Sequence, residues 1–167
     1  MIISTTSLQT TNAQWKSWAG LLLWLLICFS IAGLGGYLTS LGLTGYYELL
    51  RKPYWTPPGY VIGMVWNVLF VMMAVAIWLV WRRVGWFHWA VIAFVVQLLL
   101  NLGWSYAFFT LQCPEMAFGE LCILWLSILI TAVLFWPISR LAACLMIPYL
   151  AWVLFAGGLN YTIWQMN

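Results

Sequence analysis

The stretch KPYWTPPGYVIGMVWNVLFVMMAVAIWLVW, residues 52–81, decides the fold of this chain. It begins with a loop that carries three prolines and then continues from Gly59 to Trp81 without a charged residue. A helix that crosses the hydrocarbon core of a bilayer needs about 20 mostly apolar residues, and this run is long enough. Membrane β-strands instead alternate polar and apolar side chains. The stretch therefore predicts a membrane-spanning helix that follows a stiff, aromatic loop.

The composition of the whole chain agrees with a membrane protein. Of its 167 residues, 66% are hydrophobic and only 5% are charged, whereas about 25% are charged in a typical soluble domain. A water-soluble fold could not cover its surface with so few charges, so the bilayer is the expected solvent. The net charge of +3 is spread over the ends of apolar runs. That distribution speaks against nucleic acid as a partner.

Five apolar runs are long enough to span a membrane: about Trp18–Thr39, Gly59–Trp81, Trp86–Phe109, Glu115–Trp136 and Ser139–Trp164. Residues 1–14 are polar, uncharged and rich in Ser and Thr, and we expect residues 1–17 to form a mobile N-terminal tail instead of a cleaved signal peptide. Most connections are short, so consecutive helices should be antiparallel neighbours; only residues 40–58 form a long one. We expect an all-α integral membrane protein, in which residues 1–167 form one domain and a single bundle of five transmembrane helices.

Lysine and arginine set the expected orientation. The side of the N-terminus carries Lys16, Arg82, Arg83 and Arg140. The opposite side carries Arg51 and Lys52, accompanied by Glu48 and Glu115. Because short cytoplasmic loops are enriched in cations, we expect the N-terminus to be cytoplasmic and the long loop to lie outside. For a helical membrane protein of this kind we expect the bacterial inner membrane.

Five polar side chains interrupt the apolar runs: Asn67, Gln97, Asn101, Glu120 and Asn160. Polar groups are costly in hydrocarbon, so they usually face the interior of a bundle. Gln97, Asn101 and Trp104 share one helix face by their spacing. These amides can serve as hydrogen bonds between helices or line a cavity, and the spacing leaves both roles open.

No catalytic or metal-binding pattern appears. The chain has no G-x-S-x-G or H-E-x-x-H motif and no paired carboxylates within a run. Its four cysteines form no C-x-x-C pair, and its single histidine, His88, begins an apolar run. We therefore expect no metal and no cofactor. The residues alone indicate a membrane protein whose interior, rich in indoles and amides, suits a flat apolar ligand.

Three stretches carry a family resemblance: residues 52–81, QLLLNLGWSYAFF (97–109) and SRLAACLMIPYLAWVLFAGGLNYTIWQMN (139–167). They resemble the translocator protein family, also called the TspO, tryptophan-rich sensory protein or peripheral benzodiazepine receptor family. The resemblance covers nearly everything after Ala32. It implies a five-helix membrane protein, often a homodimer, whose members bind porphyrins, sterols and benzodiazepine-type ligands.

The resemblance also implies a set of ligand-binding positions. They are Ile62, Trp66, Asn101, Trp104, Trp152, Ala156 and Leu159 within the helices. The proline-rich loop would form a lid over them, with Trp55 closing on the ligand. We further expect Arg51 and Lys52 to meet ligand carboxylates at the rim.

Three functions are compatible with this set. The first is binding and transport or sensing of porphyrins in the membrane. The second is light-dependent breakdown of protoporphyrin, in which Trp66 and Trp152 would take part; we consider an enzyme the less favoured alternative. The third is a lipid or sterol carrier or a scaffold. The sterol-recognition pattern is incomplete, because Gln165 stands near the position where a cation is expected.

Overall fold

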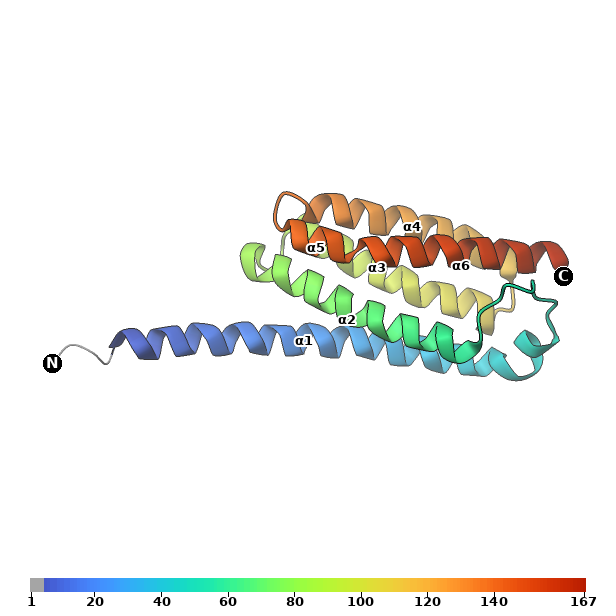
Figure 1. Cartoon of the computed structure of the whole chain (residues 1–167), viewed down its shortest axis with the longest axis horizontal. Coiled ribbons are helices and arrows are strands. Elements are labelled where there is room, and N and C mark those ends of the chain that lie inside the picture. The colour runs from blue at the N-terminus through green and yellow to red at the C-terminus, as the bar shows by residue number, and fades with distance from the viewer. Residues whose placement is uncertain (1–4) are drawn as a thin grey trace.

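The computed structural model describes the backbone of residues 5–167 and the side chains of residues 18–167. In this part of the chain the elements are α1 (Thr5–Gly42), η1 (Leu43–Tyr47), α2 (Gly59–Val84), α3 (Trp89–Ser105), η2 (Tyr106–Thr110), α4 (Pro114–Phe135), α5 (Arg140–Leu145) and α6 (Ile147–Met166). No strand occurs among these residues, and the helices lie side by side in one bundle (Figure 1).

Five helical stretches are long and apolar enough to cross a membrane: Trp18–Tyr47, Gly59–Val84, Trp89–Thr110, Pro114–Phe135 and Arg140–Met166. They correspond to the five predicted runs. The predicted fold class is confirmed, and the chain is an integral, multi-pass membrane protein.

Three predicted helix bounds need correction. α1 extends back to Thr5, so the expected tail is helical from that residue, and residues 1–4 lie outside the described part of the chain. The third run begins at Trp89 instead of Trp86, because Nδ1 of His88 accepts a hydrogen bond from the Ala90 amide and caps the helix there. The fifth run is two helices, α5 and α6, which are interrupted at Met146.

Proline explains the interruption of the fifth run. Pro148 lies in the first turn of α6, where a missing N–H does not matter, but within a longer helix it would remove a backbone hydrogen bond. α4 begins at Pro114 for the same reason. The remaining bounds differ from the prediction by a few residues at most.

Large aromatic side chains fill one end of the bundle, where residues 18–24 of α1 lie beside the last turns of α2. The rings of Trp18 and Trp78 stack with centroids 6.1 Å apart. The buried Trp24 meets Phe94 edge to face at 5.8 Å. A Cβ added at Gly20 would overlap the ring of Trp81. This half of the bundle is therefore filled by indole and phenyl rings.

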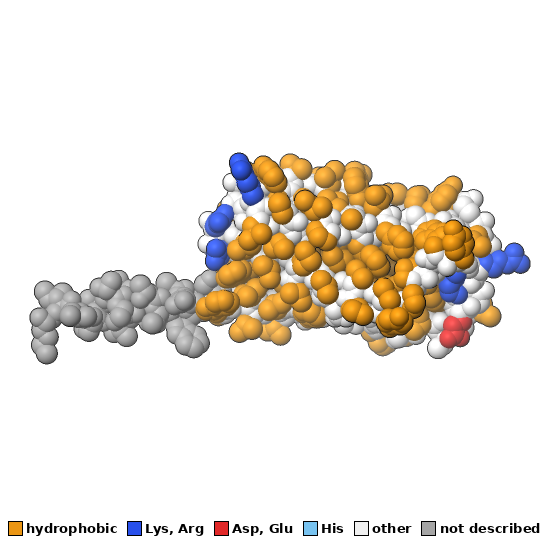
Figure 2. Space-filling model, in the orientation of Figure 1, with side chains coloured by type: hydrophobic (Ala, Val, Ile, Leu, Met, Phe, Trp, Pro, Cys, Tyr) orange, Lys and Arg blue, Asp and Glu red, His pale blue; other side chains and the backbone are white. Residues whose placement is uncertain are grey.

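On the face drawn in Figure 2, the visible charged side chains lie at the two ends of the bundle, and hydrophobic side chains cover most of the surface between them. Arg82 and Arg83 end α2, and Arg140 begins α5. The Arg82 guanidinium lies over the Trp78 ring, 4.6 Å from its centroid. Cations beside indoles at helix ends are typical of the boundary between hydrocarbon and headgroups.

Two glycines shape the opposite end. At Gly42 a Cβ would overlap the backbone carbonyl of Phe109, so only glycine lets α1 approach η2 this closely. Within η1 the backbone leaves the helical region: Thr44 is extended, and Gly45 has φ of +89°. A positive φ of this kind favours glycine. The chain can thus leave α1 and enter the long loop to α2.

We predict opposite effects of alanine at two glycines of α1. Gly42→Ala should destabilise the protein by about 2 kcal/mol, because the backbone of Phe109 cannot move aside as a side chain could. Gly33→Ala should have a neutral or slightly stabilising effect, because nothing lies within 4 Å of its added Cβ and alanine favours helix. Thermal unfolding in detergent measures both. Equal shifts in the two variants would contradict the close approach.

Candidate ligand-binding site

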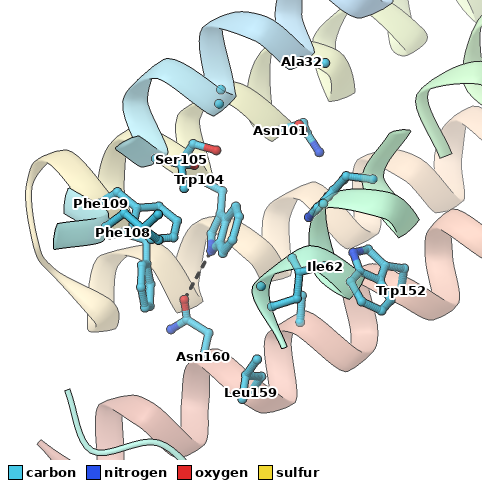
Figure 3. A pocket seen from close by; sticks show the side chains of 18 of the residues that line it. Ala32, Ile62, Asn101, Trp104, Ser105, Phe108, Phe109, Trp152, Leu159 and Asn160 are labelled. Carbon is cyan, nitrogen blue, oxygen red and sulfur yellow. Dashed lines mark hydrogen bonds between the residues drawn. The ribbon is translucent and has the colours of Figure 1, made fainter. Parts of the chain in front are cut away.

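A cavity of about 400 Å³ lies between α1, α2, α3, η2 and α6. All seven positions predicted within the helices line it: Ile62, Trp66, Asn101, Trp104, Trp152, Ala156 and Leu159. Figure 3 shows side chains from α3 and α6 directed toward this shared space. Residues far apart in the sequence therefore meet around one apolar chamber in the half of the bundle near the long loop.

Trp66 is at the centre of the aromatic wall. Its ring centroid lies 6.4 Å from that of Trp104, with the planes 29° apart. Trp152 meets it edge-on at 6.5 Å, and Tyr149 does so at 6.1 Å. Offset and edge-to-face pairs of this kind stabilise one another. The chamber thus presents indole surfaces in two orientations.

Two hydrogen-bonded bridges join α3 to α6. Nε1 of Trp104 donates to Oδ1 of Asn160 at 3.2 Å, as Figure 3 shows, and Nδ2 of Asn160 donates to the Pro114 carbonyl at 2.7 Å. Deeper in the bundle, Nδ2 of Asn101 donates to the Tyr149 hydroxyl at 3.0 Å. Asn101 and Asn160 also line the cavity. The two roles that the sequence left open, bonding between helices and lining a cavity, are both present.

The remaining polar residues behave differently from one another. Gln97 is fully buried, and neither of its amide atoms has a hydrogen-bond partner among the described residues. The two carboxyl oxygens of Glu120 are also buried and unpartnered in this part of the chain. Asn67 is exposed, contrary to the expectation that it faces the interior, because it donates back to the Gly63 carbonyl of its own helix at 2.8 Å. It still touches the edge of the cavity.

The nitrogen Nε1 of Trp152 is buried and has no hydrogen-bond partner among the described residues. Its ring nevertheless lines the cavity and stacks on Phe155, with centroids 5.3 Å apart. Buried indole N–H groups usually find an acceptor. This one is a donor without an acceptor that lies beside the chamber and is covered by protein atoms.

Sequence reasoning missed the contribution of α1 and several phenylalanines. α1 supplies Ile31, Ala32, Gly35, Gly36 and Thr39 to the lining. Phe108, Phe109 and Phe155 also line the chamber. Phe155 could have been found from its spacing, since it follows Trp152 by three residues on one helix face. Small residues in α1 gave no such signal, because they are common in membrane helices.

The proline-rich loop leads into Gly59, which lines the cavity, but Trp55 is not in the lining. Its ring instead packs against Phe155, with centroids 5.7 Å apart. Two hydrogen bonds hold the loop: the Arg51 amide donates to Oδ1 of Asn167 at 2.9 Å, and Nδ2 of Asn167 donates to the Arg51 carbonyl at 3.0 Å. Asn167 thus latches the loop to the end of α6.

The two expected rim cations do not line the chamber either. Nζ of Lys52 donates to the carbonyls of Glu48 and Leu50 at 3.3 and 3.0 Å. It also lies over the ring of Tyr47, 4.6 Å from the centroid. Since Tyr47 lines the cavity, Lys52 is one side chain away from it. Arg51 contributes through its backbone, in the latch with Asn167. Among the described residues no cluster of His, Cys, Asp or Glu could hold a metal ion.

The fold and the chamber define a class: a multi-pass helical membrane protein with an aromatic cavity between its helices. Comparison with known sequences places the chain more closely. Residues 5–165 match the TspO/MBR family, and the chain belongs to that family. The predicted family resemblance is therefore confirmed.

Several relatives are similar over most of their length. The chain is 39% identical over 145 residues to the tryptophan-rich protein TspO of Chlorobaculum tepidum, with 84% of this chain and 91% of that protein covered. It is 32% identical over 149 residues to protein CrtK of Rhodobacter capsulatus, with 84% and 89% covered. It is 33% identical over 145 residues to the translocator protein of Sus scrofa, with 82% and 86% covered. The similarity thus extends across bacteria and mammals.

Removing the latch should expose the loop to protease. In Asn167→Ala both hydrogen bonds to Arg51 are lost, so we expect trypsin to cut after Arg51 about tenfold faster, since two net hydrogen bonds contribute about 1–3 kcal/mol. Limited proteolysis in detergent with mass analysis of the fragments measures the rate. Thr162→Ala is the control, because it removes a hydrogen bond within α6 that does not reach the loop. Equal cleavage of both variants would show that the latch does not hold the loop.

Proposed function

We propose that this protein binds porphyrins and similar flat hydrophobic molecules in the chamber, and that it transports or senses them in the membrane. The observation that carries the proposal is the contact of Trp66 with both Trp104 and Trp152 inside one cavity. Ligand pockets of about 300–1,000 Å³ with mostly apolar walls and a few polar groups are typical small-molecule sites. The chamber has this character.

A planar macrocycle suits the geometry of the walls. It would lie against the faces of Trp66 and Trp104, whose planes are 29° apart. Its margin would contact the ring of Trp152. Asn101 would lie beside the ring's polar centre or margin. Ligand carboxylates would point toward the loop, where Lys52 can reach them once it leaves the carbonyls of Glu48 and Leu50. Ile62, Ala156 and Leu159 would complete the apolar contact.

Substitution of two indoles should weaken porphyrin binding. In Trp66→Phe combined with Trp152→Phe, we expect the Kd for protoporphyrin to rise about tenfold, because each aromatic contact contributes about 0.5–1.5 kcal/mol. Quenching of tryptophan fluorescence in the dark measures binding. Trp136→Phe is the control, because Trp136 is exposed at the end of α4 and does not line the cavity. Linear quenching by the unmodified protein, or equal affinity in all three, would refute this site.

Light-dependent breakdown of protoporphyrin is a second candidate, and the contact of Trp66 with Trp104 and Trp152 favours it. An indole can donate an electron to the light-excited macrocycle, which passes it on to dioxygen as superoxide. When the indole regains an electron from the macrocycle, the resulting porphyrin radical cation combines with superoxide, so both oxygen atoms enter the product and the indole ends unchanged. The positive charge of the indole radical cation could then move between neighbouring indoles. In this case the same residues would act as electron donors and not only as walls.

Illumination separates the two functions. An enzyme should form a defined product from protoporphyrin under light and oxygen, and Trp66→Phe should slow product formation by more than it lowers occupancy of the site. Chromatography of the product against a detergent blank measures this, with Trp136→Phe as the matched variant. Loss of porphyrin at the rate of the blank would rule out the enzymatic function.

We also propose the placement of the protein in its membrane. An N-terminus in the cytoplasm is supported by Arg82, Arg83 and Arg140 at one end of the bundle, against Arg51 and Lys52 at the other. The bacterial inner membrane is the membrane that we propose. Assembly as a homodimer is proposed from the family resemblance alone.

A further inference from the structure

We infer that ligands reach the chamber sideways from the hydrocarbon core of the bilayer, through a slot between α1 and α2. We call this slot the portal and define it by Gly36 and Thr39 of α1 and by Gly59, Gly63 and Asn67 of α2. All five residues line the cavity. The inference rests on the proposed function and adds a route to it.

The register of the two helices places the portal residues opposite one another. α1 and α2 run antiparallel, and the rings of Phe29 and Phe70 are in contact with centroids 6.5 Å apart. Seven residues later on α1 is Gly36, and seven residues earlier on α2 is Gly63. Since seven residues make about two helical turns, both glycines lie on the same faces as the two phenylalanines. They therefore face each other across the helix pair.

The two halves of this helix pair differ in what fills them. On one side of the Phe29–Phe70 contact, Trp18 stacks on Trp78 and the Trp81 ring covers Gly20, so large rings close the gap. On the other side the facing residues have no side chain. Gly36 and Gly63 are both exposed, and nothing lies within 4 Å of a Cβ added to either one. The cavity thus meets the surface where the ring packing ends.

The polar residue at the portal does not close it. Asn67 lies one turn along α2 from Gly63 and is exposed. Its amide donates to the Gly63 carbonyl within α2 instead of crossing to α1. α1 is also the span with the fewest buried residues. In its most apolar 18 residues, 11% are buried inside the protein, compared with 33% for α2 and 44% for α3. Much of the α1 surface beside the portal is therefore exposed to the bilayer.

The loop at the aqueous end of the bundle is held in place. It is latched to Asn167 by two hydrogen bonds, and Trp55 packs on Phe155, which lines the cavity. A flat hydrophobic ligand also dissolves preferentially in the bilayer, because burial of apolar surface is favourable. Neither Gly36 nor Gly63 places a side chain in the passage, and nothing lies within 4 Å of a Cβ added to either one, which suits a planar molecule edge-on. The portal therefore selects thin, membrane-dissolved ligands.

Filling the portal should slow binding without abolishing it. We expect Gly36→Phe and Gly63→Phe, made separately, to lower the association and dissociation rates of protoporphyrin together, each by about tenfold, because passage then requires a conformational change. The equilibrium affinity should be largely kept. Stopped-flow quenching of tryptophan fluorescence with protein in lipid vesicles measures both rates. If phenylalanine prevents folding, the smaller substitutions Gly36→Leu and Gly63→Leu test the same expectation.

Two variants serve as matched controls. Gly33→Phe adds the same ring to α1 at an exposed position that is outside the cavity lining, so both rates should stay unchanged. Asn167→Ala loosens the loop and should leave the association rate unchanged.

The inference is overturned if the portal variants bind at the normal rate, if Gly33→Phe slows binding equally, or if Asn167→Ala speeds it. A rise in the dissociation rate alone would also overturn it, since the new ring would then merely occupy the chamber. Absence of saturable quenching in the unmodified protein would instead remove the proposed function itself.

Discussion

The structure depends on one constraint: within hydrocarbon, backbone N–H and C=O groups can bond only to each other, so a span that is not part of a closed β-barrel must be a helix. With the backbone satisfied, only side-chain size distinguishes a filled interior from a hollow one. Near the start of α1 large rings fill the space, as where Trp24 meets Phe94. Toward the long loop Gly36 and Gly63 leave it open. The same helices are thus a solid support at one end and a container at the other.

The indole cluster is held by hydrogen bonds that also fix the helices. Asn160 receives the Trp104 N–H and donates to the Pro114 carbonyl, so one amide orients a ring in the chamber and joins three elements. Asn101 and Tyr149 join α3 to α6 by a further hydrogen bond deeper in the bundle. A polar bond in a dry interior is costly to leave unmade. The same hydrogen bonds therefore fix the side chains of the cavity wall and hold the helices together.

Much of this was predictable from the sequence, and the exceptions have physical causes. Hydropathy located the five spans, because length and apolarity are what a bilayer demands. It could not show that His88 caps α3 or that Pro148 divides the last span, since both effects depend on single hydrogen bonds. The family motifs located the α2, α3 and α6 walls. They did not identify the wall from α1, where small residues line the cavity, nor the packing of Trp55 onto Phe155.

The unpartnered N–H of Trp152 has a consequence for selectivity among ligands. The nitrogen is covered by protein atoms, so the Trp152 ring would have to turn to bring it to a ligand in the chamber. Under the proposed function, a ligand with an oxygen or nitrogen acceptor could then take this hydrogen, whereas a hydrocarbon of the same shape could not. Since a donor left unbonded in a dry interior costs about 1–3 kcal/mol, the ligand that carries an acceptor would bind more tightly.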